Sequence, residues 1–341
     1  MMENISWLLD IVVFFAVYLI VTLALNLQYG YTGIPNFGLA LSVATGAYTT
    51  GALAGRIGMW ICGIRSDLDY IMYNPMITSM INSAIRYDPL KGLTIFFSTI
   101  IIVVIVSAII GFIASYPAIR LRADYLMMVL IAMAEAARII GLNYTPLVGG
   151  TTWVSVPNVF IWMGDMASQF LIITILAISI LIFLFMQYLV SSPYGRLIKA
   201  VRENELTAEC VGKDVVKVKI QIMMLGSAIA GIAGSLWSFY CGTVLAAAYT
   251  RTDWTFWPWL MAMIGGMGNN IGALVGVATV IICRRLIIYY KYSLEAYIPF
   301  SVVWLEQILL ALALILVMMF RPQGIIPEKP AKPKIKKTSQ Q

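Results

Sequence analysis

The sequence predicts an all-α integral membrane protein: a polytopic helical bundle with about 8–10 spans and broken or re-entrant glycine-rich segments. Apolar residues make up 61% of the 341-residue chain and charged residues only 11%. The mean hydropathy is +0.88, far above that of an ordinary soluble domain. The apolar residues also fall into runs of about 20, the length of a helix that crosses a bilayer.

Eight runs are long enough to cross as single helices. The N-terminal residues include Glu3 and Asp10 and lack the basic segment and cleavage site of a signal peptide, so we expect the first run to remain as a span. A shorter ninth segment, 253–266, contains Pro258 and ends in glycines, and we expect it to cross as a broken or re-entrant helix. The eight runs are 8–27, 34–56, 93–114, 124–142, 168–190, 219–243, 272–290 and 298–320.

The positions of the basic residues predict the topology. Lysine and arginine collect on the cytoplasmic side of membrane proteins, so the basic stretches 191–219 and 321–341 should share that compartment. Nine crossings satisfy this condition and place the acidic N-terminus outside. The polar stretches 57–92 and 143–167 then become external loops.

We expect one membrane domain over residues 1–320, with 191–219 as its cytoplasmic loop, followed by a basic and disordered tail at 321–341 that contacts anionic lipid. The three tryptophans of the ninth segment should belong to an aromatic belt at the outer interface rather than to a ligand site. The arginines that fit this topology least well lie in the run 272–290. The tryptophans are Trp254, Trp257 and Trp259, and the arginines are Arg284 and Arg285.

The cytoplasmic loop, Ser191 to Lys219, carries six of the 23 lysines and arginines. Ser192 and Pro193 have the residue types of an N-cap and a first helical position, and Gly212 that of a left-handed helix stop. We therefore expect one or two short amphipathic helices. From periodicity alone, the loop could dock onto another protein or be a solvated connector. Its expected apolar face comprises Leu197, Val201, Ala208 and Val211, and its expected ion pairs are Lys199 with Glu203 and Arg202 with Glu205.

Two glycine-rich breaks, 30–48 and 264–276, interrupt apolar runs in opposite halves of the chain. Such breaks occur where backbone is packed inside protein or lines a wet cavity, and paired breaks point to a translocation path. Close helix packing through small residues is the alternative. The candidate path residues are Gly30, Thr32, Gly33, Asn36, Gly38, Gly46, Gly265, Gly266 and Gly268.

Glu135 and Arg138 lie three residues apart inside the run 124–142, on one helical face. Ionisable groups within a span cost about 2.5–3.5 kcal/mol each to insert and usually face a bundle interior or a cavity. A structural ion pair is the favoured interpretation, and contact with a transported molecule is the alternative. Both residues join the candidates for the path.

Several function classes have no residues to support them. No GxxxxGK[ST] motif occurs, so the chain has no P-loop for ATP, and no HExxH or GxSxG motif indicates an enzyme. The chain has no histidine, and its four cysteines lack metal-type spacing, so we expect no metal site, cofactor or disulfide. The net charge of +7 is explained by topology rather than by nucleic acid.

Several of these stretches together resemble the permeases of branched-chain amino acid ABC importers, specifically the LivM-like branch. The resemblance rests on NLQYGYTGIPNFGLALSVATGAY (26–48), LRADYLMMVLIAMAEAARII (121–140), Gly149-Gly150-Thr151, SPYGRLIKAVRENELTAECVGKDVVKVK (192–219), AMIGGMGNNIGALVG (262–276) and FRPQGI (320–325). It implies a multi-pass protein of the cell membrane that works with a second related permease, two cytoplasmic ATP-binding subunits and an extracytoplasmic substrate-binding protein. It also implies that the cytoplasmic loop couples to the ATPase through Gly195, Arg196, Arg202, Glu203, Glu205, Glu209 and Gly212.

The resemblance implies ATP-driven import of branched-chain or similar apolar amino acids, without catalysis by this chain. The sequence departs from the family pattern at Asn36–Leu39, where a histidine is usual, and at VGGT in place of TGGS. These departures leave urea or short amides as alternative cargo. A secondary transporter with Glu135 as its coupling group, and a channel or scaffold subunit, are the alternatives from other classes.

Overall fold

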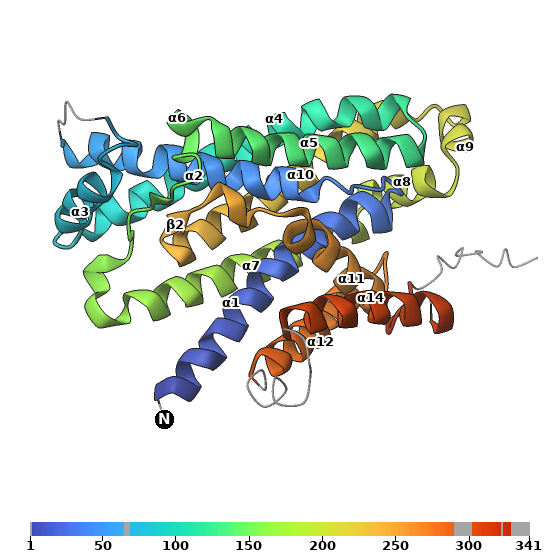
Figure 1. Ribbon diagram of the computed structural model, residues 1–341. Helices are drawn as coiled ribbons and strands as arrows, with labels where there is room; N and C mark the ends of the chain where they lie inside the picture. Colours follow the sequence, from blue (N-terminus) through green and yellow to red (C-terminus); the bar gives the residue numbers. More distant parts are fainter. Residues whose placement is uncertain (1, 65–68, 290–301, 322, 329–341) are drawn as a thin grey trace, which may run out of the picture.

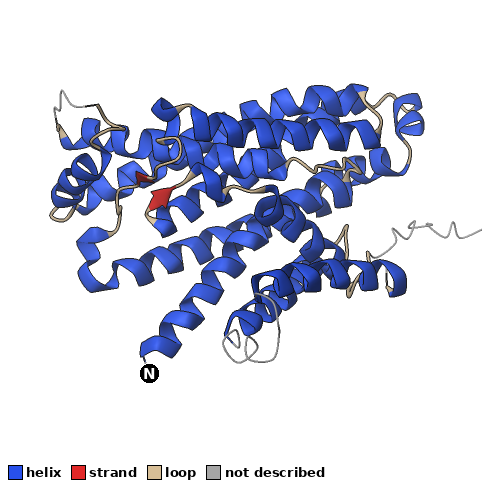
Figure 2. Cartoon of the chain, viewed as in Figure 1, coloured by secondary structure: helices blue, strands red, loops and turns tan. Residues whose placement is uncertain are grey.

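The computed structural model describes residues 2–64, 69–289, 302–321 and 323–328, and it confirms the all-α prediction. Two-residue strands β1 (Val154–Ser155) and β2 (Thr243–Val244) form a small antiparallel sheet (Figure 2). The helices are α1 (Met2–Leu25), α2 (Leu39–Cys62), α3 (Asn74–Ile85), α4 (Pro89–Arg120), α5 (Ala123–Asn143), α6 (Thr145–Val148), α7 (Ala167–Ser191), α8 (Pro193–Glu203), α9 (Glu205–Cys210), α10 (Val215–Cys241), α11 (Trp257–Gly265), α12 (Asn270–Tyr289) and α14 (Val302–Phe320) (Figure 1).

Within the described residues, six helical segments are long and apolar enough to cross a membrane. The predicted span 34–56 corresponds to α2, whose 24 residues extend about 36 Å at 1.5 Å per residue. The predicted span 298–320 corresponds to α14, and its first residues, 298–301, lie outside the described part. The six segments are Leu9–Tyr31, Pro89–Arg120, Ala123–Asn143, Ile161–Ser191, Val215–Cys241 and Asn270–Ile288.

Helix α2 lies at the centre of the bundle, packed against α10 and α4. It contains many glycines and threonines, and most of it is buried. A Cβ atom on Gly46 would overlap the carbonyl oxygen of Gly231 in α10, so the two backbones are in direct contact. The hydroxyl of Thr50 hydrogen-bonds that of Ser235 at 2.7 Å across the same interface. Small residues therefore bring these helices together, and short polar side chains join them.

The two stretches expected as external loops meet at the end of the bundle opposite α8 and α9 (Figure 1). The stretch 57–92 contains the end of α2, all of α3 and the start of α4, so it is more helical than expected. Asn74 in α3 exchanges two hydrogen bonds with the backbone of Ser155, at 3.2 and 2.6 Å. The pairing of Val154 in β1 with Val244 in β2 joins the stretch 143–167 to the segment after α10.

The expected aromatic belt is wrong. Trp254, Trp257 and Trp259 are 4%, 5% and 6% exposed, because the segment that carries them runs inside the bundle beside α1 and α12. The indole Nε1 of Trp259 donates a hydrogen bond to the carbonyl oxygen of Asn36 at 3.0 Å, and its ring stacks on Phe37 at 4.4 Å. These tryptophans connect the two halves of the chain.

Replacing Trp259 with phenylalanine tests this connection. The stacking on Phe37 is retained, but the buried carbonyl of Asn36 loses its donor, which costs about 1–3 kcal/mol. We expect a lower thermal unfolding midpoint in detergent. The matched control, Trp153→Phe, changes a tryptophan that is 64% exposed and should leave the midpoint unchanged. Equal midpoints for the two variants would contradict the proposed role of Trp259.

The two arginines that fitted the predicted topology least well lie against aromatic rings. The guanidinium carbon of Arg284 lies 4.6 Å from the ring centre of Trp257, and its Nη2 lies 3.8 Å from Asp253. The guanidinium of Arg285 lies 3.8 Å from the ring centre of Phe14. Cation–π contacts and an acidic neighbour stabilise these charges in a largely apolar helix.

Residues 323–328 of the expected disordered tail pack against the bundle, contrary to the prediction; residues 322 and 329–341 lie outside the described part. The amides of Ile325 and Ile326 donate to the carbonyl oxygens of Ile264 and Gly265 at 2.8 and 3.0 Å. Those carbonyls end α11 and lack helical donors. The tail satisfies them, which explains why it packs.

Glu328 also brings the tail to the loop 191–219. Its carboxylate is 3.0 Å from Nζ of Lys199 in α8. The loop and residues 323–328 therefore lie at the same end of the bundle, in agreement with the expectation that they share a compartment.

Candidate functional site

The cytoplasmic loop folds as two short helices, as predicted. The hydroxyl of Ser192 accepts a hydrogen bond from the amide of Gly195 at 3.3 Å and caps α8. Asn204 caps α9 through the amide of Thr207 at 3.0 Å, a cap that the sequence analysis missed. Gly212 has a φ of 75° and ends the pair in the left-handed region, as predicted. The loop is thus a compact helical element and not a loose connector.

The apolar face of the loop differs in part from the prediction. Val201 and Ala208 are buried, whereas Val211 is 70% exposed because the chain turns outward after α9. Leu206 in α9 is 74% exposed. A groove of about 560 Å³ runs between α8 and the end of α9. It is lined by Pro193, Tyr194, Arg196, Leu197, Ala200, Ala208, Val211 and Lys213.

Both predicted ion pairs of the loop are wrong. Lys199 and Arg202 each bind Glu328, at 3.0 and 2.6 Å, and Glu205 binds Lys219 at 2.7 Å. Helix α8 ends at Glu203 and Asn204 is extended, so Arg202 and Glu205 do not share a helical face, and Glu328 from the tail is the partner of both basic residues. The side chains of Glu203 and Glu209 are exposed.

Arg202 connects the loop to the first glycine break. Its Nη1 donates to the carbonyl oxygen of Gly30, and its Nη2 donates to Glu328 at 2.6 Å. A Cβ atom on Gly33 would lie 3.2 Å from Cγ of Arg202, and one on Gly268 would lie 3.0 Å from Nη1. The arginine therefore fits against backbone that carries no side chains. We call Arg202, Glu328 and these three glycines the junction.

The two glycine breaks touch each other beside the junction. The Oδ1 of Asn26 accepts from the amide of Gly268 at 2.8 Å, and its Nδ2 donates to Asn270 at 3.2 Å. Asn26 begins a π-helical turn, Asn26–Tyr31, in which the hydrogen-bond ladder of the first span changes register. The sequence predicts both breaks, but Asn26, Asn270 and Glu328 were not among the predicted site residues. Amide side chains next to the breaks were the available signal, because buried amides require partners.

The predicted path residues in the two breaks are packed closely in this conformation, except for Gly33, which is exposed. Thr32 donates to the carbonyl of Leu27 at 2.9 Å, and Asn36 donates to Gln28 at 2.8 Å. A Cβ atom would collide with neighbouring backbone at Gly38, Gly46, Gly265 and Gly266. Close packing explains these glycines here, and their role as a path lining stays a prediction.

The predicted ion pair between Glu135 and Arg138 is confirmed at 2.6 Å, but it has a third member. Arg251, from the segment after α10, binds the other carboxylate oxygen of Glu135 at 3.1 Å. The sequence analysis missed Arg251, which lies 116 positions from Glu135, a separation over which no sequence spacing predicts contact. A carboxylate held by two guanidinium groups is poorly suited to take up and release a proton, which weighs against Glu135 as the coupling group of a secondary transporter.

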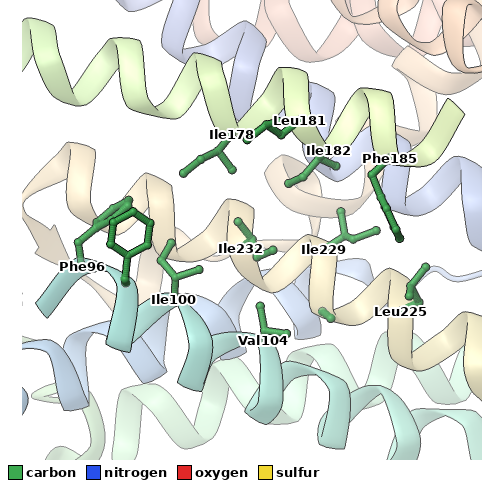
Figure 3. A pocket seen from close by; sticks show the side chains of 12 residues that line it. Phe96, Ile100, Val104, Ile178, Leu181, Ile182, Phe185, Leu225, Ile229 and Ile232 are labelled. Carbon is green, nitrogen blue, oxygen red and sulfur yellow. The ribbon is translucent and has the colours of Figure 1, made fainter. Parts of the chain in front are cut away.

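A second groove, of about 440 Å³, lies between α4, α7 and α10 (Figure 3). Its lining consists of aliphatic and phenylalanine side chains, among them Phe96, Val104, Ile178, Phe185 and Ile229. Such a lining accepts hydrocarbon, but it offers no partner for a charged ligand. In the part of the chain that the structure describes, no group of three or more Cys, Asp or Glu side chains could hold a metal ion.

Membrane-spanning helices with two glycine-rich breaks that meet a helical loop at one end are the architecture of a multi-pass transport permease of the cell membrane. Residues 7–318 match the family described as the permease component of the branched-chain amino acid transport system, and the chain belongs to this family.

Named relatives agree with this assignment. The chain is 39% identical to the "Probable branched-chain amino acid transport permease protein LivM" of Methanocaldococcus jannaschii, over 94% of this chain and 93% of that protein. It is 26% identical to the "High-affinity branched-chain amino acid transport system permease protein LivM" of Salmonella typhimurium, over 93% of this chain and 69% of that one. It is also 32% identical over 120 residues to the probable LivH permease of M. jannaschii, which covers 35% of this chain and 37% of LivH. No solved structure matches the chain.

Proposed function

We propose that this chain is a permease subunit of an ATP-driven importer for branched-chain or similar apolar amino acids. The family and the names of the relatives support the cargo and the reaction. Because the sequence has no P-loop, ATP must be bound and hydrolysed by other subunits. None of the relatives described above is named as a permease for urea or short amides, the alternative cargo.

The transporter contains a second, related permease, to which the similarity with both LivM and LivH points. We further propose that the transporter contains two cytoplasmic ATP-binding subunits and works with an extracytoplasmic substrate-binding protein. The exposed groove between α8 and α9 supports the ATP-binding subunits, since its Val211 offers an apolar contact and its Arg196 and Lys213 offer charges.

The observation that carries the proposal is the junction. Arg202 belongs to the loop that would receive the ATPase, yet its hydrogen bonds reach Gly30 and a tail that is itself bonded to Gly265. A displacement of α8 must therefore move both glycine breaks or break these bonds. Segments without helical hydrogen bonds absorb such displacements more easily than helices do, so the breaks can act as hinges between outward-open and inward-open states.

Reconstitution tests the function directly. The chain, its partner permease, the ATP-binding subunits and the binding protein are placed in proteoliposomes with labelled leucine. We expect accumulation against a gradient only with ATP and the binding protein. Uptake by the chain with a proton or sodium gradient alone would contradict the proposal, and transport of urea without transport of leucine would contradict the cargo.

Val211→Asp tests the docking groove. Burying a valine in an interface contributes about 1.5–3 kcal/mol, so we expect co-purification of the ATP-binding subunits to weaken by roughly tenfold or more. The matched control is Met72→Asp, which changes a residue that is 79% exposed at the opposite end of the bundle. Both variants should fold, since neither side chain is buried. Equal recovery of the ATP-binding subunits with both variants would rule out the groove as their dock.

A further inference from the structure

Three charged side chains gather where α5 meets the segment that precedes α11. Glu135 binds Arg138 at 2.6 Å and Arg251 at 3.1 Å, one carboxylate oxygen for each arginine. The side chains of Glu135, Arg138 and Arg251 are 25%, 29% and 43% exposed. Two positive charges and one negative charge leave this triad with a net charge of +1.

The triad lies deep in the membrane domain. Glu135 is 12 positions after Ala123, the first residue of α5, which corresponds to about 18 Å along a helix of about 32 Å. Side chains at this depth that face lipid while ionised cost about 2.5–3.5 kcal/mol each. The exposed parts of the triad must therefore meet water or polar groups rather than hydrocarbon.

Helix α5 leaves room for such an environment. Only 22% of its apolar window is buried, the smallest share among the six candidate spans. Its outer side is thus uncovered within one chain, at the same depth as the charges. The second permease of the transporter is a protein of related fold that can face this side and enclose water there.

We propose that Arg138 and Arg251 bind the carboxylate of the amino acid as it passes between the two permeases; this inference rests on the proposed function. The planar guanidinium group binds carboxylates with two parallel hydrogen bonds, and each of these arginines keeps an exposed part while Glu135 holds another. An entering carboxylate neutralises the excess charge of the triad.

The two arginines of α12, Arg284 and Arg285, do not offer this site. Arg284 lies over Trp257 and beside Asp253, and Arg285 lies over Phe14. Their guanidinium faces are occupied by aromatic rings. The triad therefore combines exposed guanidinium groups with mid-membrane depth in a way that these two residues do not.

The test compares Arg251→Gln with Glu135→Gln in the complete transporter, reconstituted with the binding protein. The readouts are leucine uptake and ATP hydrolysis in the same vesicles. In a purely structural triad, Glu135→Gln breaks both ion pairs, whereas Arg251→Gln leaves Glu135 paired with Arg138, so Glu135→Gln should be at least as damaging. If the arginines bind the carboxylate, Arg251→Gln should lower uptake per ATP about tenfold, the loss of one charge-assisted hydrogen bond, and should lower it more than Glu135→Gln, which leaves both guanidinium groups in place.

Arg251→Lys keeps the charge and should recover part of the uptake, which also covers the case that Arg251→Gln fails to fold. A loss in Glu135→Gln that equals or exceeds the loss in Arg251→Gln, or wild-type uptake per ATP in Arg251→Gln, would overturn the inference. The wild-type transporter separates the two proposals: if it shows no ATP-dependent leucine uptake, the proposed function fails, whereas normal wild-type uptake with an unaffected Arg251→Gln variant rejects the triad alone.

Discussion

Arg202→Ala is expected to reduce ATP-driven uptake by about 10- to 100-fold, since a hydrogen bond to a charged group contributes about 1.5–3 kcal/mol. Arg202 donates to the carbonyl of Gly30 and to Glu328, so its removal separates α8 from the first glycine break. The ATP-binding subunits should still bind and hydrolyse ATP, because the docking groove is unchanged. The ratio of leucine transported to ATP hydrolysed, measured in proteoliposomes, should therefore fall.

Two variants serve as controls for Arg202→Ala. Arg202→Lys keeps a charge near Glu328 but cannot make both bonds, so it should give an intermediate ratio. Lys217→Ala removes an exposed basic residue at the start of α10 and should behave as wild type. A normal transport ratio in Arg202→Ala would show that the junction does not transmit motion.

Gly46→Val is expected to prevent correct assembly of the bundle. A Cβ at this position overlaps the carbonyl oxygen of Gly231, and backbone cannot rotate away as a side chain can. Overpacking usually costs about 1–3 kcal/mol, and we expect this site to reach or exceed the upper end of that range. The measurement is the yield of monodisperse protein in mild detergent and its thermal unfolding midpoint.

The control for Gly46→Val is Thr45→Val, the neighbouring residue in α2. Thr45 is only partly buried, and its hydroxyl bonds the carbonyl of Leu41 in its own helix at 2.7 Å. The change conserves volume and removes no contact between helices, so the midpoint should shift little. A Gly46→Val protein as stable as Thr45→Val would contradict the direct backbone contact of α2 with α10.

Local signals in the sequence were sufficient for the spans and for the helices of the loop. Ser192 and Gly212 determine where α8 begins and where the α8–α9 pair ends, because a cap acts on the backbone beside it. The breaks in the spans could likewise be placed, since glycine and proline act on their own backbone. These features depend on residues within a few positions of each other.

The features that were predicted wrongly depend on contacts between distant residues. Hydropathy alone cannot distinguish a buried tryptophan from one at the interface, and Trp259 is buried because Asn36 and Phe37 lie beside it. Helical spacing suggested that Arg202 pairs with Glu205, but Glu328 competes from 126 positions away. The same limit hid Arg251 from the triad. Tertiary proximity, rather than local propensity, determines these partners.

The loop of α8 and α9 is proposed to lie in the cytoplasm, where separate ATP-binding subunits bind it. Cys210, the last residue of α9, is exposed and offers a native probe. In a variant whose other cysteines, Cys62, Cys241 and Cys283, are replaced by serine, a membrane-impermeant maleimide should label Cys210 in inside-out vesicles and not in right-side-out vesicles. Added ATP-binding subunits should slow the labelling. Labelling from the outside, or an unchanged rate when the ATP-binding subunits are present, would contradict the account.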